Sequence, residues 1–395
     1  MRRFTSLIIG GGMAADAAAR GFRELDADGS IGILSADLDA PYTRPALTKK
    51  LWTDPQFTWE QVPLNTVEDT GADLRLRTLV TSLDADAHCV RTDDGEDIGY
   101  DRLLVATGVR PRTLEGSDAA EDPVLYFRTA RDYRLLRSLV APGTPFLVIG
   151  GGYIGAELAA ALTHEHAEVT LVTPDDVLGG SQFTDTIARD YQQMFLDAGV
   201  HIVTGHQVSR VRRVDGETVA ATLDDGTEVT AASALAGLGT TPVTEFAERA
   251  GVAVDDGIIV DARLRTSIEG IWAAGDVASY RDTLLGRRRV EHVDNARHMG
   301  RAAGRSMAGA PEPYSHTPMM YSQVFGVRWE AVGTLDASLE TVELPVGEGR
   351  VVYYLDDRGA PRGVLLWNLP ERTDQARRVI ARGPIGDAAL AAAIQ

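Results

Sequence analysis

The sequence predicts an α/β protein with two parallel-sheet domains of the same build, followed by a small α+β domain. The first observation is a short apolar run at residues 146–149 that leads through three glycines, 150–152, into a helix-forming run. The second is a copy of this pattern at residues 6–15, which starts 140 residues earlier (150 minus 10). The third is a shift toward β-branched and aromatic residues from about residue 313. A repeated strand–turn–helix unit indicates two related domains in one chain.

The later glycine turn has the G-x-G-x-x-G spacing of a Rossmann-like dinucleotide-binding turn. Gly150 permits the sharp turn, Gly152 lets the backbone approach a pyrophosphate, and Gly155 lets the helix pack closely on the strand. The helix start presents unpaired N–H groups and a positive dipole end to the phosphates. A glycine-rich turn without a ligand is the alternative, and the second copy argues against it. The candidate binding residues here are Gly150, Gly152, Tyr153, Ile154 and Gly155.

The first copy and further matches support the duplication. Asp-Asp-Gly at 93–95 matches 224–226, and Gly108 matches Gly239, each 131 residues apart. Two nucleotides in one chain suggest that electrons pass between two carriers. The candidate binding residues from this comparison are Gly10, Gly12, Met13, Ala14, Ala15 and Gly239.

Periodicity and turn residues predict the order of the elements. The predicted domains are 1–115 with 246–312, then 116–245, then 313–395. The predicted strands are 4–9, 31–34, 146–149, 169–172, 257–261, one ending at 272–276, 351–355 and 363–367, with a hairpin around Asp94 and Gly95. The predicted helices are 13–25, 291–307 and 373–382.

Composition argues against several classes of function. The 395 residues carry a net charge of −18, which disfavours non-specific nucleic-acid binding. No apolar run reaches the roughly 20 residues that span a bilayer, and a strand is expected within a few residues of the N-terminus, with no room for a signal peptide. We therefore expect a cytoplasmic protein with no nucleic-acid or membrane partner. The one cysteine, Cys89, cannot supply the pair that disulfide-exchanging flavoenzymes use, and its alternating context predicts a packed strand residue.

An acidic residue follows the second strand of each predicted domain, where such a residue binds ribose hydroxyls. In the first domain Asp37 comes one residue late, so a solvated loop acid is an equal alternative. In the second domain Asp175 is available, and residues 173–176 include no Lys or Arg that could pair with a 2′-phosphate. The sequence therefore predicts a preference for NADH over NADPH.

A proline-fixed loop and four later motifs carry a resemblance to a known family. The loop PYTRPALTK at 41–49 holds Arg44 and Lys49. Taken alone, it would be a surface loop with ordinary charges. It is similar to the PYxRPPLSK segment of FAD-dependent reductases of the ferredoxin/putidaredoxin reductase type, and the chain resembles the apoptosis-inducing-factor branch even more. The other matching segments are ATG with PR at 106–112, IWAAGD at 271–276, LGRRRVEH at 285–292 and GVLLWN at 363–368.

The resemblance implies FAD in the first domain and NAD in the second. Val80 matches a position whose backbone touches the adenine, and Asp276 matches the aspartate that bonds the ribityl chain. Arg128 matches an arginine near the FAD, with an ion pair at a domain hinge as the alternative. The FAD-binding residues implied in this way are Arg44, Lys49, Val80, Ala106, Thr107, Gly108, Arg128, Gly275 and Asp276.

The resemblance also implies four catalytic positions. Tyr153 matches an aromatic residue that gates the nicotinamide site, with packing at the helix start as the alternative. Lys49 and Glu157 match a pair beside flavin N5, where a cation favours the reduced, anionic flavin. A loop cation and a first-turn helix acid are the alternatives. His292 rests on the resemblance alone. The contacts implied at the nicotinamide and isoalloxazine are Glu291, His292 and Tyr321, the last where relatives carry a tryptophan.

These residues predict an FAD-dependent NADH oxidoreductase, in which hydride passes from NADH to flavin N5. A ferredoxin- or rubredoxin-like carrier then takes the electrons, and a quinone or dioxygen is an alternative acceptor. Arg297, Arg301 and Arg305 recur on one helix face, which is either a docking site for an acidic carrier or a solvated face with ion pairs. A second hypothesis is an NADH-responsive redox sensor, which forms a stable charge-transfer complex and a redox-controlled homodimer. A third, a disulfide or peroxide reductase, would need an active Cys89.

Overall fold

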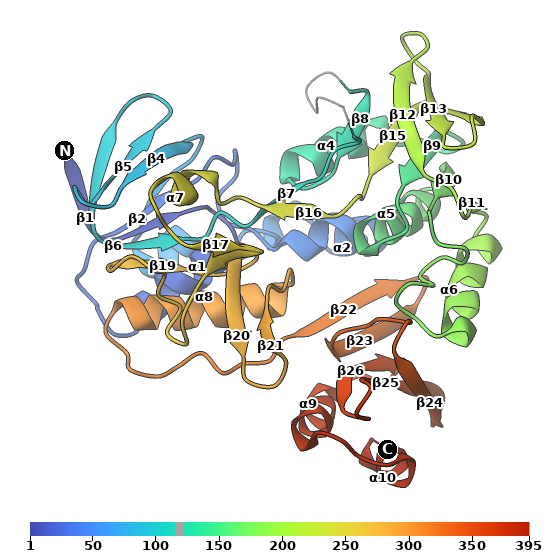
Figure 1. Ribbon diagram of the computed structural model, residues 1–395. Coiled ribbons are helices and arrows are strands. Elements are labelled where there is room, and N and C mark those ends of the chain that lie inside the picture. Colours follow the sequence, from blue (N-terminus) through green and yellow to red (C-terminus); the bar gives the residue numbers. More distant parts are fainter. Residues whose placement is uncertain (116–121, 395) are drawn as a thin grey trace. The chain divides into compact units, whose positions relative to one another are not determined.

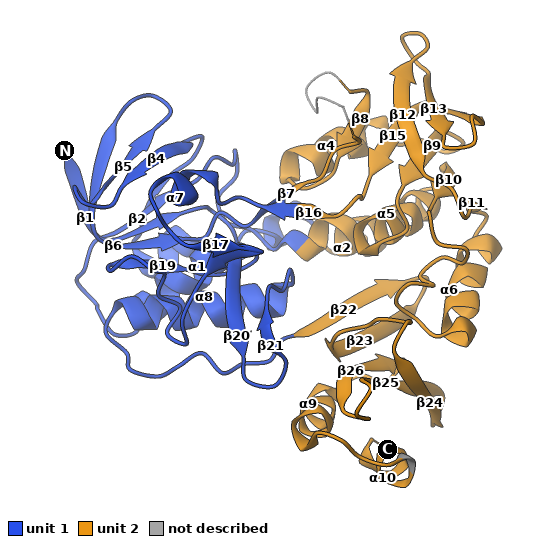
Figure 2. Cartoon of the chain, in the orientation of Figure 1, with its two compact units in different colours: residues 1–44, 58–110, 241–318 blue, residues 45–57, 111–240, 319–395 orange. Residues whose placement is uncertain are grey.

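The computed structural model describes residues 1–115 and 122–394, and the chain divides into two compact units (Figure 1, Figure 2). Unit 1 consists of Met1–Arg44, Thr58–Arg110 and Thr241–Pro318. Unit 2 consists of Pro45–Phe57, Pro111–Thr240 and Met319–Gln395. The predicted boundary at 115/116 adjoins residues outside the described part, and the division into three domains stays a prediction. Within the described residues, no helix is both long and apolar enough to cross a bilayer.

Unit 1 is built on a seven-stranded sheet in the order β3-β2-β1-β6-β5-β4, with β19 also paired to β6. The strands β3, β2, β1, β6 and β19 are parallel, whereas β5 pairs antiparallel with both β4 and β6. The hairpin predicted around Gly95 is the one between β5 and β6. The strands are β1 (Arg2–Ile9), β2 (Ile31–Leu34), β3 (Asp73–Arg75), β4 (Val80–Asp84), β5 (Cys89–Thr92), β6 (Asp97–Val105) and β19 (Ile271–Ala273).

Two helices of unit 1 pack closely because glycines line their contact. Helix α1 (Met13–Arg23) meets helix α8 (Val293–Met307) where a Cβ on Gly300 or Gly304 would overlap a carbonyl oxygen of α1. Helix α8 begins two residues later than predicted because the His292 ring caps it, with Nδ1 accepting from the Asp294 N–H at 3.1 Å. The remaining elements of unit 1 are α3 (Thr66–Thr70), α7 (Glu245–Arg249), β17 (Val254–Asp255), β18 (Gly257–Ile259), β20 (Ala278–Asp282) and β21 (Gly286–Arg288).

Strand β18 ends two residues before the predicted end at 261. The Asp261 carboxylate accepts the backbone N–H groups of Arg263 and Arg265, so the chain turns here instead of extending. Similarly, β19 ends at Ala273, before the predicted 272–276 segment is complete.

Unit 2 contains a second parallel sheet, in the order β11-β10-β9-β15-β8, beside a three-stranded antiparallel sheet β12-β13-β14. Its helices include α2 (Lys50–Thr53), α4 (Ala130–Leu139), α5 (Tyr153–His164) and α6 (Asp185–Asp197). The strands are β8 (Val124–Tyr126), β9 (Pro145–Ile149), β10 (Glu168–Val172), β11 (His201–Val203), β12 (Val208–Arg213), β13 (Val219–Leu223), β14 (Glu228–Ala231) and β15 (Ser233–Ala236). Two Rossmann-like sheets are therefore present, as predicted.

The C-terminal part of unit 2 is an antiparallel five-stranded sheet, β22-β23-β26-β25-β24, with helices after it. The predicted α+β character is confirmed, and helix α9 has the predicted bounds. The elements are β22 (Met319–Val324), β23 (Val327–Gly333), β24 (Glu340–Val346), β25 (Gly349–Leu355), β26 (Pro361–Trp367), α9 (Thr373–Arg382) and α10 (Asp387–Ala393).

Candidate functional site

The glycine turn of unit 2 joins β9 to α5. Gly150 has φ +97°, and a Cβ there would lie 2.5 Å from the Gly237 carbonyl oxygen. A Cβ on Gly155 would overlap the carbonyl oxygen of Gly150, so the helix and the turn touch through their backbones. Gly152 caps α5 without a side-chain hydrogen bond, and no atom lies within 4 Å of the place where its Cβ would be. The helix start is therefore open to an incoming group.

The glycine turn of unit 1 has the same design between β1 and α1. Gly10 has φ +113°, and a Cβ there would overlap the Ala106 carbonyl oxygen. Gly12 caps α1 without a side-chain hydrogen bond and also has open space at its Cβ position. A Cβ on Gly275 would lie 2.8 Å from the Cβ of Ala14. The parallel ends of β1, β6 and β19 thus bring the first turn, Ala106 and Gly275 together.

The two predicted ribose acids lie at equivalent positions. The Asp37 N–H donates to the Ser35 hydroxyl at 3.2 Å, and the Asp175 N–H donates to the Thr173 hydroxyl at 3.4 Å. Their carboxylates differ in surroundings: Asp37 accepts from the Tyr42 hydroxyl at 3.1 Å and has the Arg44 guanidinium at 3.6 Å.

Asp175 instead accepts from the Ser181 hydroxyl at 3.0 Å. Asp37 is therefore half of an ion pair within its own unit, and not the solvated loop acid of the alternative interpretation.

A buried carboxylate on α5 organises the predicted Lys–Glu pair. Glu157, 4% exposed, accepts on Oε2 from the Lys49 ammonium and the Thr48 hydroxyl, both at 2.6 Å. Its Oε1 accepts from the Ser322 hydroxyl at 2.6 Å. A carboxylate removed from water in this way is held by one full charge and two hydroxyl donors. Sequence reasoning missed Thr48 and Ser322, although each adjoins a candidate residue.

The aromatic ring of Tyr321 contacts Lys49 of this pair and also Arg328, which belongs to a second ion pair. The Tyr321 ring lies 5.5 Å from the Lys49 ammonium and 5.0 Å from the Arg328 guanidinium. Arg328 in turn donates to the buried Glu330 at 2.7 Å. The prediction missed Arg328 and Glu330, since neither adjoins a motif. Burial raises the pKa of Tyr321, and the nearby Glu157 carboxylate adds to this, so the ring remains a neutral phenol.

Tyr153, the predicted gate, lies at the start of α5 with its ring 5.3 Å from Trp329. Burial of the hydroxyl raises the pKa of Tyr153 to about 12, although 37% of the residue is exposed. The ring is therefore both packed against Trp329, which sequence reasoning missed, and partly accessible. Ile154 beside it is 40% exposed.

The other candidates of unit 1 are distributed along its elements. The Thr107 hydroxyl donates to the Val243 carbonyl at 2.8 Å, which is a structural bond. Glu291 forms an ion pair with Arg289 at 2.6 Å, and His292 caps α8.

Gly108 has φ +66°, Val80 is the buried first residue of β4, and Asp276 is half-buried.

In unit 2, Gly239 has φ +84° and so repeats the conformation of Gly108. The Arg128 backbone N–H donates to Asp132 at 3.0 Å, just before α4.

Two sequence interpretations can be compared with surface contacts. Arg301 and Arg305 both pair with Glu24, at 2.6 and 2.8 Å, so this part of the arginine face contains the ion pairs that the alternative interpretation, a solvated face, includes.

Cys89 lies on β5 and is half-buried, as predicted for a strand residue. Burial raises the pKa of the Cys89 thiol, and Asp84 and Asp97 add to this, which disfavours a reactive thiolate.

The residues present fit two dinucleotides. Each glycine turn offers a helix start that has no side-chain cap and has open space beside it, which suits a pyrophosphate. Each second strand is followed by an acid, which suits ribose hydroxyls. This arrangement is that expected of an oxidoreductase that uses two dinucleotides.

Comparison with known proteins agrees with this class. The family model for pyridine nucleotide-disulphide oxidoreductases matches residues 4–300. The ferredoxin–NAD(+) reductase component of an anthranilate 1,2-dioxygenase system of Burkholderia cepacia is 32% identical, over 96% of this chain and 95% of the relative. Monodehydroascorbate reductase 5 of Oryza sativa subsp. japonica is 32% identical, over 91% and 79%. The chain belongs to the pyridine nucleotide-disulphide oxidoreductase family.

Comparison with solved structures indicates the type of enzyme within this family. The covalent putidaredoxin reductase–putidaredoxin complex superimposes with a TM-score of 0.89 at 28% identity, covering 99% of this chain and 96% of that one. The protein is therefore an NAD(P)H-dependent flavin oxidoreductase of the ferredoxin reductase type. Apoptosis-inducing factor 1 of Dictyostelium discoideum is 29% identical, over 97% of this chain and 79% of the relative, so the likeness to this branch that the motifs indicated is present beside the likeness to ferredoxin reductases.

Proposed function

We propose that the chain uses NADH, binds FAD through the turn of unit 1 and NADH through the turn of unit 2, and reduces a small ferredoxin- or rubredoxin-like carrier. The observation that carries the proposal is the buried Lys49–Glu157 pair with its two hydroxyl donors. Burying an ion pair costs desolvation energy, so a pair retained here is better explained by chemistry than by stability. When bound, the flavin would supply the exchange of a hydride at N5 for single electrons.

The protein residues have positioning and electrostatic roles. Lys49 would place a positive charge where the reduced flavin gains negative charge, and Glu157 would fix the direction of the Lys49 ammonium. Thr48 and Ser322 would hold the carboxylate so that it cannot rotate away from Lys49. Tyr153 would cover or uncover the nicotinamide position, since its ring packs on Trp329 while 37% of the residue is exposed. No side chain needs to act as a general base.

Asp175 supports NADH as the substrate. Its carboxylate accepts from a neutral hydroxyl, so it keeps its full negative charge toward a ribose. That charge would accept from free 2′- and 3′-hydroxyls and repel a 2′-phosphate.

The names of two relatives support a protein carrier as the acceptor. One is a ferredoxin–NAD(+) reductase component, and the other was solved in a covalent complex with putidaredoxin. Because Arg301 and Arg305 are engaged by Glu24, we place the carrier site outside that pair. A quinone or dioxygen would replace the carrier if no small iron–sulfur protein accepted electrons.

The proposal is tested by anaerobic stopped-flow absorbance of the flavin-loaded protein, mixed with NADH and in parallel with NADPH. Bleaching of the flavin bands within milliseconds, with NADH saturating at lower concentration than NADPH, is expected. Subsequent mixing with ferredoxin or rubredoxin should restore the bands. A persistent long-wavelength charge-transfer band, slow turnover with every acceptor and an NADH-dependent change in size on a column would instead support the redox sensor. Absence of any flavin uptake would refute both.

A further inference from the structure

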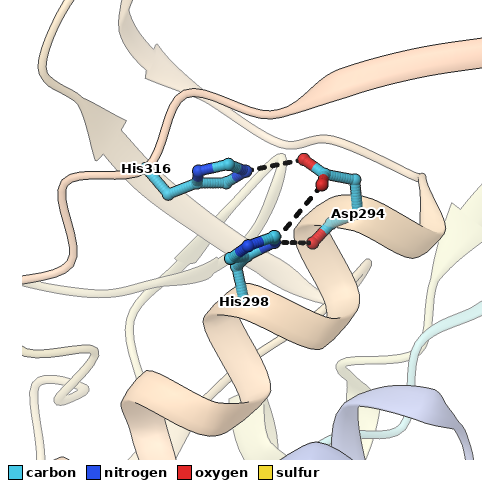
Figure 3. A group of neighbouring side chains, drawn as sticks. All are labelled: Asp294, His298 and His316. Atoms are coloured by element: carbon cyan, nitrogen blue, oxygen red, sulfur yellow. Dashed lines mark hydrogen bonds and ion pairs between the residues drawn. The ribbon is translucent and has the colours of Figure 1, made fainter. Parts of the chain in front are cut away.

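We propose that Asp294, His298 and His316 form a binding site for a divalent transition-metal ion of the zinc type. The three side chains come from the first turns of α8 and from the segment that follows this helix (Figure 3). One ligand atom of each residue lies within 4.8 Å of the others. All three residues belong to unit 1, so the site is complete within one compact unit.

The carboxylate of Asp294 lies between the two imidazoles. Oδ2 is 2.6 Å from Nε2 of His316, and Oδ1 is 3.3 Å from Nδ1 of His298 (Figure 3). Zinc ligands at about 2.0–2.1 Å in a tetrahedral arrangement are roughly 3.3 Å apart, so changes of about 1.5 Å or less in the separations of these atoms would suffice. Two imidazoles, one carboxylate and an open fourth position form a donor set that zinc commonly takes.

The side chains are already oriented by the fold. The two histidine rings are stacked at 3.8 Å with 18° between their planes, which places their nitrogen-bearing edges toward the same carboxylate. Nδ1 of His298 also lies 2.9 Å from the Asp294 carbonyl oxygen, one helical turn earlier. This contact holds the imidazole in one orientation. Because it uses the nitrogen that faces the carboxylate, a metal bound at Nδ1 would displace the proton donated to the carbonyl.

Access to the site suits a cation, whereas the local charge is mixed. The side chains of Asp294 and His316 are 17% and 22% exposed, whereas that of His298 is 52% exposed, so the site is fixed on one side and open on the other. The helix start and Arg297 one turn later oppose a cation. Further along α8, Arg301 and Arg305 are compensated by Glu24. The net charge of −18 adds a general attraction.

A second cluster, His206 with Asp224 and Asp225, provides an internal comparison. Here the carboxylates approach opposite nitrogens of one ring, at 2.8 and 3.9 Å, and both acids are exposed. The hydrogen bond that the His206 ring donates to Asp224 raises the pKa of His206, which favours a proton over a metal. This cluster is therefore expected to bind metal more weakly.

The test is equilibrium dialysis of the flavin-loaded, tag-free protein against Zn²⁺ after treatment with a chelator, with metal measured by elemental analysis. One Zn²⁺ per chain is expected in the low micromolar range. His298→Ala and His316→Ala should each weaken binding at least about tenfold, the loss typical of disturbing a metal site. His206→Ala and the exposed His201→Ala are matched controls and should bind as the unchanged protein does.

Cu²⁺ electron paramagnetic resonance adds a readout that is independent of catalysis. The spectrum should show coupling to two nitrogens, and to one in His298→Ala. Because His298 is the most exposed ligand, this variant should keep its circular dichroism spectrum and flavin content. No zinc binding, or binding that persists in both His298→Ala and His316→Ala, would overturn the proposal and leave a His–Asp–His hydrogen-bonded cluster.

Discussion

The glycine turns of the two units are built alike and are used differently. In both, the first glycine has a left-handed φ and touches a neighbouring strand, and the second caps an open helix start. The third small position differs: Ala15 accommodates a methyl group in unit 1, whereas a Cβ on Gly155 would overlap the turn in unit 2. Under the proposed function, the duplicated backbone would fix where phosphates bind, and the side chains around it would assign the chemistry.

Buried acids on the helix that follows each glycine turn illustrate this assignment. On α1, Asp16 accepts from Arg20 at 3.0 Å and from the Thr66 hydroxyl at 2.7 Å, both within unit 1. On α5, Glu157 accepts from Lys49 and two hydroxyls. Both acids have a cationic and a hydroxyl partner, so their contacts alone do not distinguish a structural acid from one that takes part in the reaction. We assign only Glu157 to the reaction.

The largest effect is expected when Glu157 is substituted and the result is compared with that of substituting Asp16. Glu157→Gln keeps the size of the side chain but removes the charge that directs Lys49. We expect flavin reduction by NADH to slow by about 100-fold, the scale of losing one preorganised electrostatic group. The Kd for NADH should change much less. Stopped-flow reduction at several NADH concentrations separates the two quantities.

Asp16→Asn is the matched control for that variant. It should lower stability by about 1–3 kcal/mol in urea unfolding, because Arg20 and Thr66 lose a charged partner. The reduction rate should stay unchanged. Equal slowing in both variants would mean that the buried acids act through stability alone.

The second prediction tests which nucleotide each of the two glycine turns binds. Ala at Gly12 or Gly152 meets open space and an extended backbone, so the protein without nucleotides should keep its melting temperature. Each methyl group would crowd a pyrophosphate at a cost of about 1–3 kcal/mol, or roughly tenfold or more in affinity. Gly12→Ala should lower FAD content, and Gly152→Ala should weaken NADH binding while FAD content stays normal. The reverse pattern would exchange the assignments of the two units.

The third prediction concerns the acids after the second strands. Asp175→Asn removes the charge that repels a 2′-phosphate, worth roughly 1 kcal/mol between unit charges about 4 Å apart in water. The preference for NADH over NADPH should therefore fall about fivefold in steady-state kinetics. Asp37→Asn should leave this preference unchanged, since it acts in the other unit. An unchanged preference in Asp175→Asn would remove it from the ribose site.

Most of this framework could be predicted from sequence, because it depends on local rules. Glycine spacing, an apolar strand before it and an acid after the second strand gave both turns and the equivalence of Asp37 and Asp175. The Asp-Asp-Gly repeats form two hairpin turns with equal φ, +87°, at Gly95 and Gly226. Helix α9 followed from periodicity alone.

The residues that complete the Lys49–Glu157 cluster could not be predicted in the same way. Ser322 is 165 positions from Glu157, and serine hydroxyls occur throughout any chain, so no local pattern marks this one. Trp329 is brought to Tyr153 by the order of the C-terminal strands, which the sequence does not state. The ion pairs on the arginine face could not be predicted for a related reason: Arg301 and Arg305 share a face, but their partner Glu24 comes from the end of another helix.

The smallest effect is expected at Cys89. The repeat of 131 residues matches Cys89 on β5 to Ala220 on β13, a fully buried strand position. If the duplicated build is right, Cys89 fills space as Ala220 does, and its raised thiol pKa keeps it from acting as a nucleophile. Cys89→Ala should therefore retain the flavin reduction rate and carrier reduction within error, with a stability change below about 1 kcal/mol for a half-buried strand residue.

Loss of turnover in folded, flavin-loaded Cys89→Ala protein would contradict this reading and restore a thiol mechanism, with one sulfur acting where the family name implies a pair. Retained turnover would establish that a chain of this disulphide-oxidoreductase family transfers electrons from nucleotide to acceptor without sulfur chemistry.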